Sequence, residues 1–162
     1  MDSRLSRTNI AKPPVHPIER LNWEHARLLG EVDRLGLFAE AQKADIEGIG
    51  GRAVKLTEAL EHHQEAEERF LFPLVPGLGE ELFAGLREEH LRLVQATDEL
   101  SSLARSGQTG STTRLLLLFK KNLRSHFTRE EEEVLLKAAG LLSPAQLDIL
   151  RIKFASRKGM NL

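Results

Sequence analysis

Two histidine–glutamate pairs, each four residues apart, constrain the fold of this chain more than any other feature. The first pair is His63 and Glu67, and the second is His126 and Glu130. Residues four apart share one face of a helix. Each pair continues an apolar stripe, which runs Ala53, Leu56, Leu60, His63, Glu67, Phe70 in one segment and Leu116, Phe119, Leu123, His126, Glu130, Val134 in the other. This spacing predicts two helices that face a bundle core.

Polar side chains at core positions need partners, because a buried carboxylate or imidazole without one is costly. A metal ion shared between the two pairs supplies a common explanation. Two more helical stripes each contain one histidine, His25 and His90, among apolar neighbours. These stripes are Ile18, Leu21, His25, Leu28, Val32, Leu35 and Phe83, Leu86, His90, Leu93, Thr97, Leu100, Ala104.

Turn signals divide the chain into four long helices and a short fifth. Glycines in residues 41–51, prolines and glycines in 73–79, and glycines in 106–113 mark the connectors. The predicted helices cover residues 17–40, 52–72, 80–105 and 112–138. Ser143, Pro144 and Gln146 form a capping-box start for the fifth. We therefore predict a flexible N-terminal arm (1–15), a helical bundle (16–140) and a C-terminal helix packed on the bundle (141–162).

The chain repeats itself. Residues 24–28 match residues 89–93 at four of five positions, and at a similar offset the segment from His63 to Glu68 aligns with the segment from His126 to Glu131. Each repeat supplies one histidine followed by a histidine–glutamate pair. Two helical hairpins packed antiparallel predict an all-α protein, an up-down-up-down four-helix bundle.

The composition limits which metal ligands and which radical chemistry the chain could use. The chain has no cysteine, so a metal would be held by nitrogen and oxygen, and no tyrosine, which excludes tyrosyl-radical chemistry. Its formal net charge of -1 suggests neither a nucleic-acid nor a membrane partner. No targeting signal or membrane-length apolar run is present, so a cytoplasmic protein is expected. A protein partner cannot be identified from the sequence.

Four imidazoles and two carboxylates exceed the four ligands of a structural zinc site. They suit two transition-metal ions with bridging carboxylates, and the ligand types fit iron, manganese or zinc. The predicted ligands are His25, His63, Glu67, His90, His126 and Glu130. If each ion takes two histidines and both glutamates bridge, each has four protein bonds, and an oxo or hydroxo bridge would add a fifth. One position would then stay open for dioxygen, nitric oxide or peroxide.

The order of these six residues resembles the hemerythrin-like, or HHE cation-binding, family. The segment from Glu67 to Pro73 is also similar to the end of the family's second helix, and the resemblance covers about residues 17–138. It implies a four-helix bundle around a non-haem, oxo-bridged di-iron centre. Oxygen-carrying hemerythrins have a second histidine on the third helix, where this chain has Leu86 or Val94, and an aspartate five residues after the last histidine. The four-histidine, two-glutamate set is more similar to iron–sulfur repair proteins, whose N-terminal cysteines are absent here.

Three functions follow as hypotheses. The favoured one is a di-iron protein that binds dioxygen or nitric oxide in sensing or stress response. The second is an enzyme-like role in removing nitric oxide or peroxide, or delivery of iron for the repair of iron centres. The third is a structural bundle whose site is empty or holds adventitious zinc. No general base or substrate cleft can be identified, which favours binding over catalysis.

Several neighbours of the predicted ligands have roles that the sequence leaves open. His62 points about 100° away from His63 on a helix and is expected to be exposed, as is His16. Glu24 and Glu89 precede ligand histidines and either form surface ion pairs or orient imidazoles. In the acidic run from Glu130 to Glu133, we expect a solvated face after Glu130, with Glu133 as the possible exception.

Overall fold

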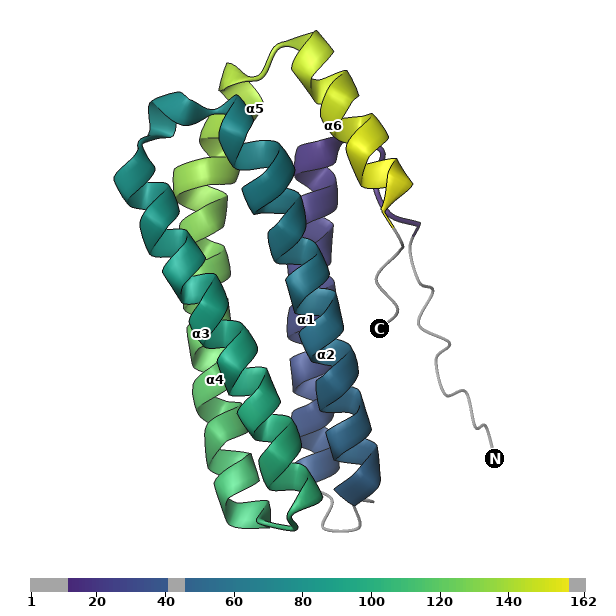
Figure 1. Cartoon of the computed structure of the whole chain (residues 1–162). Helices are drawn as coiled ribbons and strands as arrows, with labels where there is room; N and C mark the ends of the chain where they lie inside the picture. Colours follow the sequence, from purple (N-terminus) through teal and green to yellow (C-terminus); the bar gives the residue numbers. More distant parts are fainter. Residues whose placement is uncertain (1–11, 41–45, 158–162) are drawn as a thin grey trace.

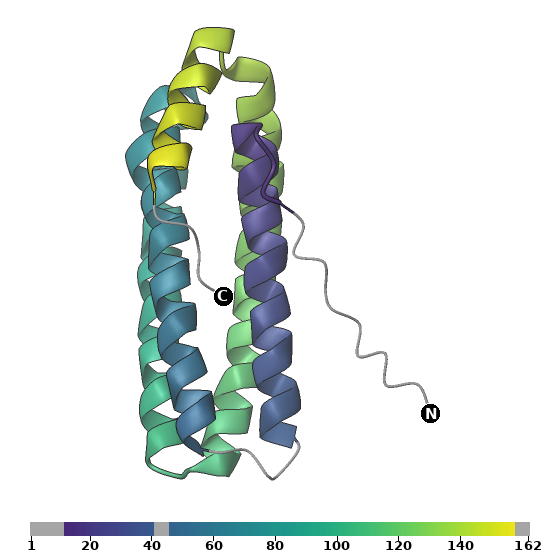
Figure 2. The same cartoon turned by 90° about the vertical axis from the view of Figure 1, so that its right-hand side faces the viewer.

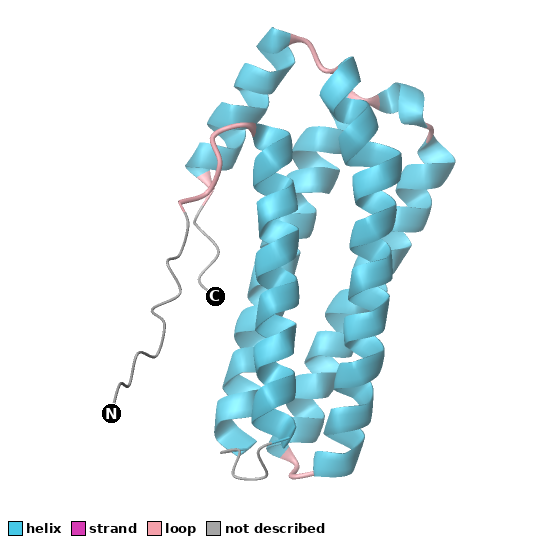
Figure 3. Cartoon of the chain, turned by 180° about the vertical axis from the view of Figure 1, so that it is seen from behind, coloured by secondary structure: helices cyan, strands magenta, loops and turns pink. Residues whose placement is uncertain are grey.

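The computed structural model describes residues 12–40 and 46–157, and in these residues it contains helices and no strand (Figure 3). This confirms the predicted all-α class. Residues 1–11 of the predicted arm lie outside the described part. The helices are α1 (Pro17–Glu40), α2 (Ile46–Ala66), α3 (Glu80–Arg105), α4 (Thr109–Glu130), α5 (Leu136–Leu141) and α6 (Pro144–Ser156). Shorter turns are η1 (Glu67–Leu71), η2 (Phe72–Leu74), η3 (Pro76–Leu78) and η4 (Glu131–Leu135).

The four long helices form an up-down-up-down bundle (Figure 1). α2 packs against α1 and α3, and α4 packs against α3 and α1, so that each helix has two neighbours. A second view shows α6 lying along the outside of the bundle (Figure 2), where it contacts α1 and η1. No helix in the described ranges is long and apolar enough to cross a membrane.

The start of α2 differs from the prediction. We expected residues 41–51 to form a connector because of Gly48, Gly50 and Gly51, but α2 already begins at Ile46 and includes all three glycines. Gly50 has a packing reason for its place in a helix. A Cβ there would lie 3.1 Å from Cγ of Arg105 on α3, so glycine allows the two helices to approach closely.

Several other helix ends follow their local signals, but α4 already begins at Thr109 and includes Gly110, before its predicted start at residue 112. Pro73 and Pro76 occur where α2 has given way to the short turns, and Gly79 enters α3 with a φ of 104°, which favours glycine. The predicted capping box at Ser143 is present, with Gln146 as its third residue. The fourth helical segment runs past its predicted end, because residues 131–141 continue it through Gly140.

Two apolar clusters fill the bundle and leave a polar layer between them. One cluster, which we call the lower apolar cluster, lies toward the end of the bundle where α3 joins α4 (Figure 1) and includes Leu35, Leu56, Leu100 and Phe119. The other lies at the opposite end and includes residues of η1, η4 and α6, among them Phe154. In each of the four long helical segments, the predicted ligands interrupt the apolar stripe between these clusters.

Candidate metal centre

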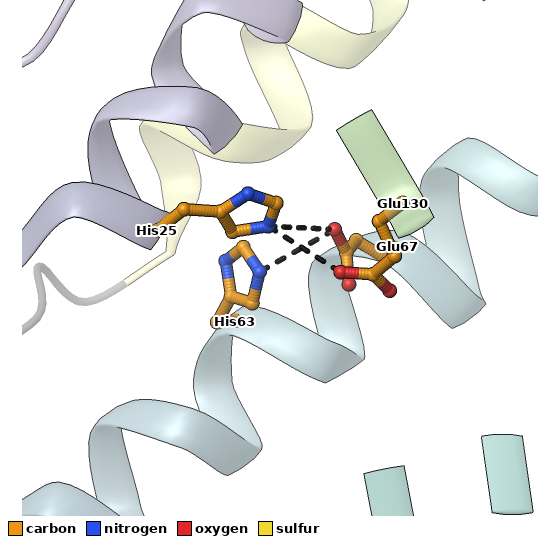
Figure 4. A group of neighbouring side chains, drawn as sticks. All are labelled: His25, His63, Glu67 and Glu130. Atoms are coloured by element: carbon orange, nitrogen blue, oxygen red, sulfur yellow. Dashed lines mark ion pairs between the residues drawn. The ribbon is translucent and has the colours of Figure 1, made fainter. Parts of the chain in front are cut away.

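The six predicted ligands converge in the layer between the apolar clusters. His25 comes from α1, His63 from α2 and His90 from α3, and their exposed fractions do not exceed 2%. The remaining three are Glu67 at the start of η1 and His126 and Glu130 near the end of α4. All six are buried. Figure 4 shows four of them, with two imidazoles facing two carboxylates.

Each carboxylate directs one oxygen to each pair of histidines. Oε1 of Glu67 lies 3.3 Å from Nε2 of His63 and 3.7 Å from Nε2 of His25, whereas its Oε2 lies 3.5 Å from Nε2 of His90. Glu130 is placed in the opposite sense: its Oε2 lies 3.4 Å from His25, and its Oε1 lies 2.9 Å from His90 and 3.3 Å from His126. The structure therefore forms two clusters of ligand atoms that share Glu130.

Most of these inward-facing atoms have no hydrogen-bond partner among the residues that the structure describes. They are Nε2 of His25, His63 and His126, both carboxylate oxygens of Glu67 and Oε2 of Glu130. Buried polar atoms are seldom left unpaired. For bonds of 2.0–2.2 Å to a shared ion, neighbouring ligand atoms would lie about 3.3–3.6 Å apart at a tetrahedral angle and about 2.8–3.1 Å apart at a right angle. The separations of 2.9–3.7 Å fall in or close to these ranges, so the donor set fits metal ions.

The outer nitrogen of each of the four ligand histidines contacts another carboxylate. Nδ1 of His63 lies 2.9 Å from Glu24, and Nδ1 of His126 lies 2.7 Å from Glu89. These bonds fix each imidazole with Nδ1 as the donor and Nε2 directed toward the centre, as in metal sites whose histidines are held by carboxylates. Of the two roles left open for Glu24 and Glu89, the structure supports orientation of the imidazoles for both, and Glu89 also forms an ion pair with the partly exposed Arg129.

The other two histidines are held by residues that the sequence analysis did not identify. Nδ1 of His90 lies 2.6 Å from Glu68, and Nδ1 of His25 lies 2.9 Å from Glu131. Glu131 is exposed, as expected for the acidic run after Glu130, but it also contacts a ligand histidine, which that expectation did not include. The repeat contained the signal, because Glu68 and Glu131 follow the two predicted ligand glutamates at equivalent positions.

The four histidine–carboxylate bonds form a closed ring around the bundle, which we call the carboxylate ring. Glu24 on α1 binds a histidine on α2, and Glu68 just beyond α2 binds one on α3. Glu89 on α3 then binds α4, and Glu131 just beyond α4 binds α1. Each helical segment supplies one carboxylate and one imidazole, so every neighbouring pair of helices is joined once at the level of the centre.

Two π-helical turns help to place these residues. η1 begins at Glu67 and η4 begins at Glu131, at nearly equivalent points of the repeat. A π-turn adds a residue to the turn and so changes which side chains face the core. The prediction that Phe70 continues the apolar stripe is met only in part. Phe70 packs against the apolar cluster but is partly buried, whereas Leu71 beside it is fully buried.

The charges of the site shift several pKa values. Burial alone would lower the pKa of His90, but hydrogen bonds to Glu130 and Glu68 and the charge of Glu67 raise it to about 10. The pKa of His25 is likewise raised, against the effect of burial, by neighbouring carboxylates. Burial would raise the pKa of Glu130, but the imidazoles around it lower it well below its usual range. Metal ions would compete with protons at these imidazoles.

Glu24 is the most strongly enclosed carboxylate of the ring. Burial alone would raise its pKa, but the hydrogen bond to His63 and the charges of His63, Arg157 and Arg20 lower it to about 2. Its side chain is 2% exposed, compared with 29% for Glu89 at the equivalent position. The two halves of the centre therefore have the same ligand types but different surroundings.

The remaining sequence-based expectations have mixed outcomes. His16 is exposed, as predicted. His62 is half-buried rather than exposed, and its carbonyl oxygen accepts a hydrogen bond from Arg157 over 2.9 Å. Glu133, the suggested exception in the acidic run, pairs with Arg129 away from the centre.

A pocket borders one of the ligand histidines. It has a volume of about 270 Å³ and lies between α3 and α4, where His126 and Arg129 are among its lining residues. The ring of Phe127 stacks on another ligand histidine, His25, at a centroid distance of 3.9 Å. A pocket and an aromatic ring therefore both contact imidazoles of the centre.

Comparison with known proteins agrees with this geometry. The family model described as the hemerythrin HHE cation binding domain matches residues 16–138, which include all six predicted ligands. A search of the curated proteins found no match.

Proposed function

The chain belongs to the hemerythrin HHE cation-binding family, and on this premise we propose that it is a di-iron protein that binds a small ligand. The six buried histidines and glutamates would hold two iron ions, with zinc or manganese as competitors for the same donors. When bound, the iron would supply an open coordination position for dioxygen or nitric oxide. This ligand binding would serve sensing or a stress response.

The observation that carries the proposal is the placement of the two carboxylates. Glu67 and Glu130 each direct one oxygen to either pair of histidines. Most of the inward-facing atoms lack hydrogen-bond partners in the described part of the chain, which favours cations at two positions. The carboxylate ring supports the same reading, because an imidazole that donates through Nδ1 to a carboxylate has its Nε2 left to bind a metal once the Nε2 proton is released.

Metal analysis tests the stoichiometry. Protein produced in iron-replete cells should contain two iron ions per chain. His63→Ala should lower the iron content, because it removes a ligand with no exposure to solvent. His62→Ala is the matched control: it alters the adjacent residue, keeps the backbone carbonyl and should leave the iron content unchanged. One ion per chain in the wild type, or loss of iron only in the control, would contradict the proposal.

Ligand binding is tested by spectroscopy on the iron-loaded protein. Added azide or nitric oxide should shift its near-ultraviolet and visible bands if a coordination position is open. Steady turnover of nitric oxide or peroxide in the same samples would instead favour the enzyme-like alternative. An unchanged spectrum with every added ligand would indicate a closed site and refute small-ligand binding.

A further inference from the structure

The end of α6 reaches the metal centre from outside the bundle. Arg157, the residue that follows α6, has a side chain that is only 6% exposed. Its guanidinium lies 4.7 Å from the ring centroid of Phe154, and Phe154 is itself buried in the apolar cluster at this end of the bundle. The position of Arg157 is therefore fixed by the docking of α6.

Arg157 contacts two groups next to His63, namely the carboxylate of Glu24 and the backbone of His62. Its Nη2 lies 3.0 Å from Oε1 of Glu24, and its Nη1 donates to the carbonyl oxygen of His62 over 2.9 Å. The other oxygen of Glu24 holds Nδ1 of His63 at 2.9 Å. One planar guanidinium thus links the carboxylate behind the imidazole to the backbone beside it.

The equivalent half of the centre lacks this link. Glu89 is held by Arg129, whose Nη1 lies 2.5 Å away, but Arg129 is on α4 itself and is 36% exposed. Within residues 12–40 and 46–157, Glu24 is the only one of the four ring carboxylates that is held by a residue outside the four bundle helices and their π-turns. The repeat therefore does not explain Arg157, which belongs to the C-terminal segment alone.

We propose that Arg157 is a positioning residue for the metal centre. By holding Glu24 it fixes the orientation of the His63 imidazole, so that the docking of α6 and the affinity of one metal position are coupled. This inference rests on the proposed metal-binding function. Arg20 contacts the same oxygen of Glu24 at 3.3 Å, so loss of Arg157 removes the tether to α6 while a positive charge remains beside the carboxylate.

The test uses cobalt(II) as the probe metal and the full chain. Wild type, Arg157→Gln and Arg151→Gln are compared by competition with a chelator and by proton NMR of the cobalt-loaded protein. Arg151 is the matched control, because it lies on α6 and pairs with Asp148 at the surface. Each metal-bound histidine should give one shifted N–H signal, four in all.

Arg157→Gln should weaken binding at one of the two cobalt positions roughly tenfold, the lower end of the effect of residues that support metal ligands. The N–H signal of His63 should shift or exchange faster with solvent, while the other three remain. Arg157→Lys keeps the charge but has a single ammonium in place of the planar fork, so it should restore part of the affinity. Arg151→Gln should behave as the wild type.

Failure of the proposed role of Arg157 and failure of metal binding would give different results. If the wild type binds two cobalt ions and Arg157→Gln binds them equally well with an unchanged His63 signal, the residue only fastens α6 and the inference is overturned. A lower unfolding temperature alone would not support it. If the wild type itself binds no cobalt, the proposed function fails, and the inference fails with it.

Discussion

Replacement of Glu24 by glutamine should reveal a stabilisation that depends on pH in the metal-free protein. The pKa of Glu24 is about 2 in the fold, against an ordinary 4.5. Each pH unit of difference corresponds to about 1.4 kcal/mol, so the charged carboxylate stabilises the fold by about 3 kcal/mol at neutral pH. Glutamine resembles the protonated carboxyl and should lose this contribution.

The stabilisation by Glu24 should increase with pH, because the fold lowers the pKa of this carboxyl. A carboxylate with a depressed folded-state pKa stabilises above its unfolded value and loses that effect as the pH falls toward the folded value. The difference between wild type and Glu24→Gln should therefore be about 3 kcal/mol at pH 7 and about 1.4 kcal/mol at pH 3.

Urea unfolding, followed by circular dichroism with a chelator present, measures this difference. Glu19→Gln on the exposed face of α1 serves as the control and should change stability by only about 0.5 kcal/mol or less. A Glu24→Gln difference that is the same at pH 3 and pH 7 would refute the reasoning. It would mean that packing rather than charge accounts for the effect of the carboxylate.

Three further predictions concern the centre and the core. Metal binding at pH 7 should release protons, because carboxylates raise the pKa of His25 and His90, and calorimetry in buffers of different ionisation enthalpy would detect this release. Glu131→Gln should weaken metal binding roughly tenfold, whereas Glu132→Gln next to it should have no effect, as measured by chelator competition. Leu100→Ala should lower the free energy of unfolding by about 2–5 kcal/mol in urea titrations without changing the number of ions bound, since this buried side chain lies in the lower apolar cluster.

The bundle was predictable because its helices have regular stripes and clear end signals. The stripe from Phe83 to Ala104 is buried at every predicted position, and α3 has the predicted bounds. The start of α2 was not predictable from local signals. Its glycines resemble a connector, and the contact of Gly50 with Arg105 that explains one of them depends on the packing of α3.

The inner part of the site was also accessible from the sequence, whereas the carboxylate ring was not. The spacing of His63 and Glu67 places both on one helix face whatever the neighbouring helices are. The contacts of Glu68 and Glu131 depend instead on the π-turns and on which helix lies beside them. Arg157 could not have been identified, because 133 residues separate it from Glu24.

The carboxylate ring has a consequence for how the chain could be rearranged. Its four bonds join α1 to α2, α2 to α3, α3 to α4 and α4 back to α1, so every helix is bonded to both of its neighbours. α1 begins at the same end of the bundle where α4 finishes, and α2 and α3 are joined there too (Figure 1). A circular permutant opened between α2 and α3, with a linker from the end of the chain to α1, would retain all four bonds. The four bonds of the ring therefore depend on which helices lie side by side, and not on which of them the loops connect.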